Sequence, residues 1–214
     1  MGNLAVPDNS SEFSSDIKIL GLTLWVVPPR PDAERLKAIM GRFCSNSKST
    51  GSGSLPKFEP HITLAKIPAG MPLSAVRKCI PQGQIQLDVT FKSVEMGSHY
   101  FRSVYIAVDL SPELTTLHQK VHAALQTMPE TPAFPHISLC YVLDMDAEKG
   151  LRHQIFRSLR LKEDNDGIAL DCGGGADYED RMTGFKADEI WVTKCEGPVE
   201  TWEVVDIIEL PRLS

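Results

Sequence analysis

The stretch Pro60-His61-Ile62-Thr63-Leu64 has a near copy later in the chain, Pro135-His136-Ile137-Ser138-Leu139. In an extended strand successive side chains point to opposite faces, so each imidazole shares a face with the hydroxyl two residues further on. Each proline marks the start of its strand, because proline has no N–H to donate to a ladder. If the two strands lie side by side, four polar side chains converge: His61, Thr63, His136 and Ser138.

Length and composition indicate a globular protein. A chain of 214 residues can bury a sizeable core, either as one domain or as two lobes that share a cleft. Hydrophobic content of 42% and charged content of 23% are ordinary for a soluble protein. No apolar run reaches membrane-spanning length, and the N-terminus lacks the pattern of a signal peptide. We therefore expect a cytoplasmic protein with no membrane partner.

Charge and cysteine content narrow the partners and the compartment. The net charge of −6 argues against an extended nucleic acid as ligand, because such binding depends on clustered Lys and Arg. A small anionic ligand needs only a few donors and stays possible. Five cysteines without CxxC spacing fit a reducing compartment, with one disulfide left open as an alternative.

The N-terminal part of the chain divides into four segments. Residues 1–16 are polar and without periodicity, which predicts a disordered tail before a single domain over 17–214. The β-branched run 17–27 predicts a strand that carries Trp25. A helix then starts at Asp32 and buries one face. The Ser/Gly-rich run 45–54 predicts a flexible loop. The apolar stripe of the helix is Leu36, Ile39, Met40 and Phe43.

Strands and helices alternate in the rest of the chain. The patterns predict helices over 73–80, from Ser111 onward, and over 151–161, and strands over 85–91, 104–110, 189–194 and 202–210. The run 171–184 is rich in Gly and Asp and predicts a loop. The helix after Ser111 has an apolar stripe of Leu114, Leu117, Val121, Leu125 and Met128. The interleaving predicts the α+β class, with two pseudo-symmetric lobes that each have an antiparallel sheet and helices.

The paired motifs resemble those of the 2H phosphoesterase superfamily, which is named for two His-x-Thr/Ser motifs. Within it the chain most resembles the cyclic phosphodiesterases of fungi and plants, over about residues 19–210. Matching residues outside the two His-x-Thr/Ser triplets are Trp25, Phe58, Glu59, Pro60, Leu139, Tyr141, Ile190, Trp191 and Trp202.

The resemblance implies a bilobal 2H phosphoesterase fold with the active site in the cleft between the lobes. It implies a monomer that hydrolyses 2′,3′-cyclic nucleotides to 2′-phosphates and ADP-ribose 1″,2″-cyclic phosphate, a by-product of tRNA splicing, to ADP-ribose 1″-phosphate, with no cofactor and no metal. By resemblance, Trp25 and Tyr141 stack on the base or line the sugar pocket. The usual 2′-phosphate product places the attacking water beside His136 and the leaving 3′ oxygen beside His61.

The residue types suit this chemistry. Hydrolysis of a cyclic phosphodiester needs a base that activates water and an acid that protonates the departing sugar oxygen. Imidazole, with an ordinary pKa of about 6.5, can fill either role near neutral pH. The hydroxyls of Thr63 and Ser138 can donate to the non-bridging oxygens as negative charge develops there.

Several residues also have a simpler interpretation. Trp25 is as well explained as a core residue, because Trp buries a large area in any sheet. Strict strand alternation places Tyr141 on the core side and Cys140 on the histidine side, unless the strand bulges. His118 and His122 have the spacing of a metal pair on a helix, but a solvated helix edge explains them better.

Two other functions stay open. One is a different enzyme of the superfamily, such as an RNA-end phosphodiesterase or a 2′-5′ RNA ligase-like protein, which would favour a basic groove. The other is a non-catalytic nucleotide-binding module, against which the presence of both histidines and both hydroxyls argues.

Overall fold

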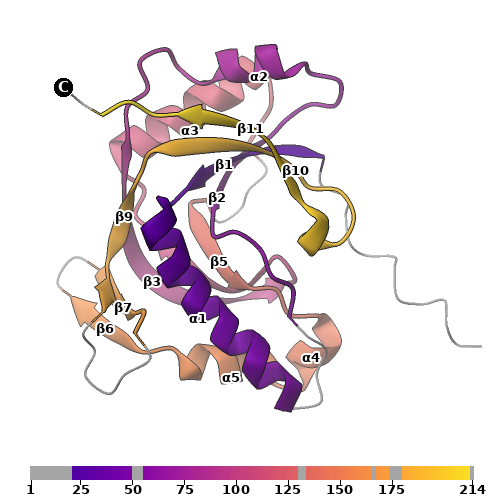
Figure 1. Cartoon of the computed structure of the whole chain (residues 1–214), viewed down its shortest axis with the longest axis vertical. Coiled ribbons are helices and arrows are strands. Elements are labelled where there is room, and N and C mark those ends of the chain that lie inside the picture. The colour runs from indigo at the N-terminus through magenta and orange to yellow at the C-terminus, as the bar shows by residue number, and fades with distance from the viewer. Residues whose placement is uncertain (1–20, 50–54, 130–133, 165–166, 174–179, 213–214) are drawn as a thin grey trace, which may run out of the picture.

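The computed structural model describes residues 21–49, 55–129, 134–164, 167–173 and 180–212 (Figure 1). The predicted tail 1–16 lies outside these residues. The helices are α1 (Arg30–Ser49), α2 (Leu73–Cys79), α3 (Pro112–Leu125), α4 (Asp144–Glu148) and α5 (Leu151–Ser158), with one 3₁₀ turn, η1 (Val199–Thr201). The strands are β1 (Leu22–Val27), β2 (Ile62–Lys66), β3 (Leu87–His99), β4 (Arg102–Val108), β5 (His136–Cys140), β6 (Leu161–Asp164), β7 (Gly167–Asp171), β8 (Arg181–Met182), β9 (Gly184–Ala187), β10 (Glu189–Lys194) and β11 (Glu203–Glu209).

One curled sheet of eight strands forms the frame, in the order β11-β10-β1-β2-β5-β4-β3-β9, with every described pairing antiparallel. A separate three-stranded sheet has the order β6-β7-β8. The two halves of the large sheet meet where β2 pairs with β5, and the pairing there joins Ile62 to Ile137. The sheet is therefore continuous through the junction at which the two motifs lie.

The two halves repeat the same strand-helix-strand unit. The first unit is β1-α1-β2 and the second is β4-α3-β5, and in each the second strand carries a motif. The helices are exchanged, because α1 packs on β5 and α3 packs on β2. Figure 1 shows α1 lying across the sheet, with α2 and α3 together at one end of the molecule and α4 and α5 at the other. The predicted α+β class, with antiparallel strands and helices in two similar halves, is confirmed. The sheets expected of the two lobes are joined into one, because β2 pairs with β5.

The apolar stripes of the two exchanged helices supply much of the core. All four predicted stripe residues of α1 are buried. In α3 four of the five are buried, and the Ser111 hydroxyl accepts the N–H of Leu114 at 3.2 Å as the predicted cap. The prediction for Met128 was wrong: the helix ends at Leu125, where Gln126 adopts a left-handed φ of 55°, and Met128 is 82% exposed.

The polar segments are more ordered than the sequence predicts. The described backbone of α1 continues to Ser49, into the run 45–54 that we expected to be a loop, while residues 50–54 lie outside the description. Serine costs little in a helix that is already nucleated, so the helix can extend past its apolar stripe.

The predicted loop over 171–184 contains β8, and the predicted helix over 151–161 ends at Ser158, before β6.

Two further observations concern the whole described chain. None of its helices combines the length and the apolar character needed to cross a membrane. All five cysteines lie in the described ranges, and no disulfide joins them.

The close approach of β9 to β3 at Gly184 gives a prediction for stability. A Cβ on Gly184 would collide with the carbonyl oxygen of Val89 across the β3–β9 pairing, whereas a Cβ on Gly41 of α1 would have nothing within 4 Å. We expect Gly184→Ala to lower the free energy of unfolding by about 1–3 kcal/mol. Gly41→Ala should raise it by about 0.5–1 kcal/mol, because alanine is the better helix former. Urea denaturation of both variants checks this, and equal effects would contradict the described β3–β9 register.

Candidate active site

The register between the two motif strands decides which side chains meet. Because Ile62 of β2 lies opposite Ile137 of β5 in an antiparallel pair, one step along each strand places His61 opposite Ser138. The same step in the other direction places Thr63 opposite His136. Each imidazole is therefore the cross-strand neighbour of the hydroxyl from the other motif.

These four side chains line one pocket of about 160 Å³. Trp25 and Tyr141 line it as well, so the structure brings all six candidate site residues together. Phe101, Lys66 and Trp202 complete much of its wall. The catalytic and binding roles of the six residues stay predictions.

His61 is held in one tautomer and kept away from water. Its Nδ1 lies 2.7 Å from the carbonyl oxygen of Glu59, and since a carbonyl can only accept, Nδ1 carries the proton. Nε2 is left for a ligand. The imidazole stacks on the indole of Trp25 with ring centroids 3.7 Å apart and planes 8° from parallel, and the residue is 7% exposed.

Burial governs the charge state of His61. The loss of hydration lowers its pKa to about 4, against the raising effect of the Glu59 carbonyl, and the charge of His136 lowers it further. The imidazole is therefore neutral at pH 7, with a lone pair on Nε2.

His136 is more accessible and is bordered by a tyrosine that the sequence did not single out. The ring of Tyr105 meets the imidazole edge-on, with centroids 5.3 Å apart. The Tyr105 hydroxyl donates to Glu95 Oε2 at 2.6 Å, which fixes the ring in place. The strand pairing Tyr105↔Ser138 explains this position, but no local pattern in the sequence predicts that β4 lies beside β5.

The two hydroxyls differ in their surroundings. Thr63 is half-buried and lies opposite Trp25 in the β1–β2 pairing. Ser138 is buried, and its Oγ donates to the carbonyl oxygen of Phe101 at 2.7 Å. A phosphate oxygen that bound at Ser138 would compete with this carbonyl for the same proton.

A β-bulge places Tyr141 in the pocket. On β4 the pairing moves by one residue, from Tyr105 to Val104, while on β5 it moves by two, from Ser138 to Cys140. The extra residue on β5 exchanges the two faces of the strand for the residues that follow it. Tyr141 therefore lies on the histidine side, and Cys140 lies outside this pocket, the reverse of what strict alternation predicts.

Burial also decides the protonation of both side chains after the bulge. It raises the pKa of the Tyr141 phenol well above its ordinary value, so the hydroxyl stays a donor. It raises the pKa of the Cys140 thiol to about 12, which excludes a thiolate nucleophile near neutral pH.

Aromatic rings surround the imidazole of His61 and the phenol of Tyr141. Phe58 stacks on Tyr141 with centroids 4.0 Å apart, and its edge-on distance to His61 is 6.3 Å. Phe101 lies 5.2 Å from Tyr141, and Trp202 lies 5.9 Å from Trp25. No motif in the sequence indicates Phe101, and its only local signal is the pair of aromatic residues at the β3–β4 turn.

The next feature is the arrangement of the side chains that could act as metal ligands. Among the described residues no group of three or more His, Cys, Asp or Glu side chains could hold a metal ion. The expectation that His118 and His122 form a solvated edge was wrong. His122 is 6% exposed, its Nδ1 lies 2.9 Å from Thr127 Oγ1, and His118 stacks on Phe134 at 3.9 Å.

Comparison with known proteins places the chain among hydrolases of this kind. Residues 20–210 match the family model of cyclic phosphodiesterase-like proteins. A 2′,3′-cyclic-nucleotide 3′-phosphodiesterase of Yarrowia lipolytica is 28% identical over 221 residues, which cover 88% of this chain and 99% of that protein. A cyclic phosphodiesterase of Arabidopsis thaliana is 25% identical over 193 residues, and the match covers 88% of this chain and 94% of that protein.

Solved structures show the same fold. E. coli LigT in its apo form superposes with a TM-score of 0.53 at 12% identity, covering 90% of this chain and 98% of that one. LigT complexed with 3′-AMP gives a TM-score of 0.51 at 12% identity, and the match covers 89% of this chain and 97% of that one. With the family model matching nearly the whole chain, this protein belongs to the cyclic phosphodiesterase-like family of the 2H phosphoesterase superfamily, a family of hydrolases.

Proposed function

We propose that this chain hydrolyses 2′,3′-cyclic nucleotides to nucleoside 2′-phosphates by acid–base catalysis with His61 and His136. The observation that carries the proposal is the β2–β5 register, which sets each imidazole opposite the hydroxyl of the other motif in one pocket. A cyclic phosphodiester needs two proton transfers on opposite sides of one phosphorus atom, and two separate imidazoles can supply them.

The proposed step is an in-line attack by water. His136 takes a proton from the water as its oxygen bonds to phosphorus. The bond from phosphorus to the 3′ oxygen breaks, and that oxygen takes a proton from Nε2 of His61. Thr63 and Ser138 donate to the non-bridging oxygens, where negative charge increases in the transition state.

His61 can act as the acid only when substrate is bound. In the unoccupied pocket it is neutral, since its pKa is about 4. A phosphodiester anion beside Nε2 supplies the opposite charge that favours imidazolium, and the same burial that lowers the pKa strengthens this attraction. Binding of the anion and uptake of the proton are therefore coupled.

The relatives support a nucleotide substrate. The Yarrowia protein is named for 2′,3′-cyclic nucleotides and for the 3′ position, and LigT was crystallised with 3′-AMP. ADP-ribose 1″,2″-cyclic phosphate presents the same five-membered cyclic phosphate and is the second substrate that we propose. We further propose that the protein is a cytoplasmic monomer and that it acts on by-products of tRNA splicing.

The two rival functions are less well supported. An RNA-end enzyme would need a basic groove, and the net charge of −6 disfavours one. A non-catalytic module would have no need for both imidazoles and both hydroxyls in the one pocket.

The direct test is turnover of adenosine 2′,3′-cyclic phosphate in the presence of EDTA, followed by ³¹P NMR. We expect adenosine 2′-phosphate as the product and a rate that chelation does not change, because imidazoles and hydroxyls alone perform the chemistry. A 3′-phosphate product would contradict the assigned bond cleavage. A rate lost in EDTA and restored by one divalent ion would contradict the metal-free mechanism.

Substitution of each histidine separates catalysis from folding. We expect His61→Ala and His136→Ala each to lower kcat by about 10²–10⁴-fold, the usual contribution of a positioned acid or base. His153→Ala, in an exposed part of α5, is the matched control and should keep the full rate. Near-normal turnover in either active-site variant with an unchanged thermal transition would exclude that histidine from the chemistry.

The charge state of His61 gives a pH prediction. NMR titration of its Cε1–H should show a neutral imidazole down to about pH 4 in the free protein. Between pH 6.5 and 4 the unfolded histidine binds a proton that the folded one does not, so the stability due to this group falls as the pH falls through that range. Bound adenosine 2′-phosphate should raise the pKa. A pKa that stays low with the product bound would assign His61 as the base and His136 as the acid.

A further inference from the structure

The strand β2 has a bulge at the same place as β5. Where the pairing moves by one residue on β1, it moves by two on β2, from Thr63 to Ala65. Before the bulge Trp25 pairs with Thr63, and beyond it Thr23 pairs with Lys66. Because Trp25 and Thr23 share one face of β1, their partners share one face of β2. Lys66 therefore lies on the histidine side, whereas strict alternation would turn it toward the core.

The two bulges make Lys66 the counterpart of Tyr141. Each of the two follows the histidine of its own motif by five positions, His61 in one half and His136 in the other. Each lies beyond the bulge of its strand, and each lines the histidine pocket. The backbone is thus repeated while the side chain differs, because one half contributes a buried phenol and the other an exposed lysine. The two sides of the pocket are therefore suited to different chemical groups.

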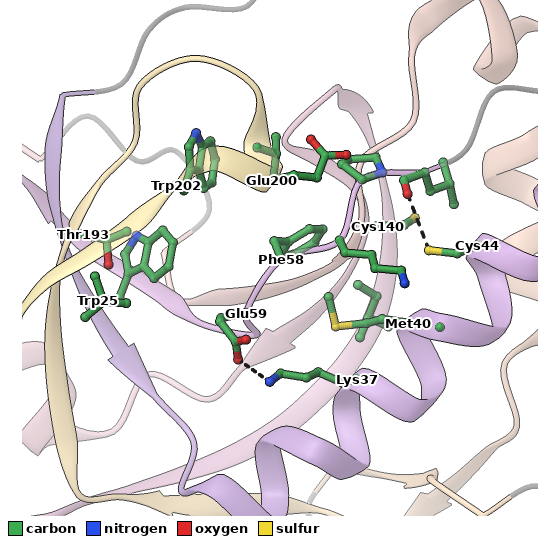
Figure 2. A pocket seen from close by; sticks show the side chains of 17 residues that line it. Trp25, Lys37, Met40, Cys44, Phe58, Glu59, Cys140, Thr193, Glu200 and Trp202 are labelled. Carbon is green, nitrogen blue, oxygen red and sulfur yellow. Dashed lines mark hydrogen bonds and ion pairs between the residues drawn. The ribbon is translucent and has the colours of Figure 1, made fainter.

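Two larger cavities adjoin the histidine pocket, and the first has balanced charges. It lies beside α1, has a volume of about 460 Å³ and shares Trp25 and Trp202 with the pocket (Figure 2). Figure 2 shows Lys37 directed at Glu59, and Lys37 Nζ lies 2.7 Å from Glu59 Oε2. The other charged residues of its lining are one lysine and one glutamate. With two charges of each sign, this cavity offers an anion no net attraction.

The second cavity has a volume of about 470 Å³ and shares Thr63 and Lys66 with the histidine pocket. We name it the α3 cavity, because His122 of α3 and the following residues Thr127 and Met128 line it. Among the described residues that line either of these two spaces, Lys66 is the one Lys or Arg, and none is Asp or Glu. In a protein with a net charge of −6, an anion that spans both spaces would meet a cation and no opposing carboxylate.

A substrate held by its cyclic phosphate can extend into the α3 cavity. Thr63, which we propose as a donor to the cyclic phosphate, lines this cavity as well, so a group on the same sugar can pass it and reach Lys66. The lysine ammonium has three donors and is a common ligand of phosphate. A further hydroxyl in the lining belongs to Thr127, whose Oγ1 lies 2.9 Å from His122 Nδ1. A cation together with a hydroxyl suits a phosphate ester.

We propose that Lys66 and the α3 cavity bind a second phosphate group of the substrate, esterified to carbon 5 of the sugar that carries the cyclic phosphate. This inference rests on the proposed hydrolysis of cyclic phosphates and names the substrate class, a sugar cyclic phosphate with a phosphate or diphosphate on carbon 5. ADP-ribose 1″,2″-cyclic phosphate belongs to this class, whereas adenosine 2′,3′-cyclic phosphate does not.

The test uses two substrates that differ only in the second phosphate. They are adenosine 2′,3′-cyclic phosphate with and without a 5′-phosphate, so the base and the reacting group are shared. Wild-type kcat/KM should favour the 5′-phosphorylated substrate by about three- to tenfold, the scale of a charge-assisted contact that is partly hydrated. The difference should lie in KM and should shrink as salt is added, because salt screens exposed charges.

Lys66→Met removes the charge and keeps an unbranched side chain. The preference should disappear through a higher KM for the 5′-phosphorylated substrate, while kcat/KM for the other substrate stays nearly unchanged. Lys162→Met is the matched control, because Lys162 is an exposed lysine of β6 that lines neither space. An equal loss for both substrates in Lys66→Met would assign Lys66 to the cyclic phosphate and overturn the proposal.

Met128 allows a test in both directions. It lines the α3 cavity and is 82% exposed, so a charge there leaves the core intact. Met128→Lys should raise the preference and Met128→Glu should lower it, because the first attracts the second phosphate and the second repels it. Met145, which is 58% exposed on α4 and lines neither space, supplies the matched Lys and Glu controls. Equal shifts at both positions would be an effect of net charge and would contradict the proposal.

The outcomes separate the two proposals. Turnover of neither substrate by the wild-type protein would overturn the proposed function and the second-phosphate site with it. Turnover of both substrates with equal kcat/KM, or with a preference that Lys66→Met and the Met128 variants leave unchanged, would overturn the second-phosphate site and leave the proposed function in place. If Lys66→Met fails to fold, the Met128 variants decide.

Discussion

The pairing of Ile62 with Ile137 is the constraint on which the site depends. Both side chains are fully buried, and their antiparallel register is what sets each imidazole opposite the other motif's hydroxyl. A slip of one residue would turn every polar side chain of one motif toward the core. The exchanged packing of α1 on β5 and α3 on β2 opposes such a slip, because each helix contacts the motif strand of the other half. The repeat in the sequence is thus a repeat in three dimensions, with the histidine pocket at the junction of the two halves.

The aromatic surroundings give the pocket its electrostatic character. Stacking on Trp25 excludes water from His61, and the Glu59 carbonyl fixes the proton on Nδ1. Nε2 is therefore an uncharged hydrogen-bond acceptor. Such a site disfavours imidazolium until an anion enters, and it then holds the anion more tightly than a hydrated site would. An acidic protein can therefore bind an anionic substrate without a basic surface, provided that the substrate is small enough to enter.

The sequence predicted the site where the signal was local and failed where it was not. Two motifs with strand alternation were enough to place His61, Thr63, His136 and Ser138 together. Tyr141 was predicted only through family resemblance, because the bulge at Leu139 appears in the pairing of β5 with β4 and not in any periodicity. Tyr105 comes from β4, which is distant in the chain from both motifs, so its place follows from the sheet order alone. The helical backbone through Ser49 was missed because low-complexity composition obscures an extension whose energetic cost is small.

The most direct test is a crystal structure with vanadate and a nucleoside, which together mimic the transition state of phosphodiester hydrolysis. We predict a vanadium centre between the two motif strands, with Nε2 of His61 and the imidazole of His136 each within hydrogen-bond distance of a different apical oxygen. Vanadate bound outside the pocket, or held by only one of the two imidazoles, would contradict the two-histidine account.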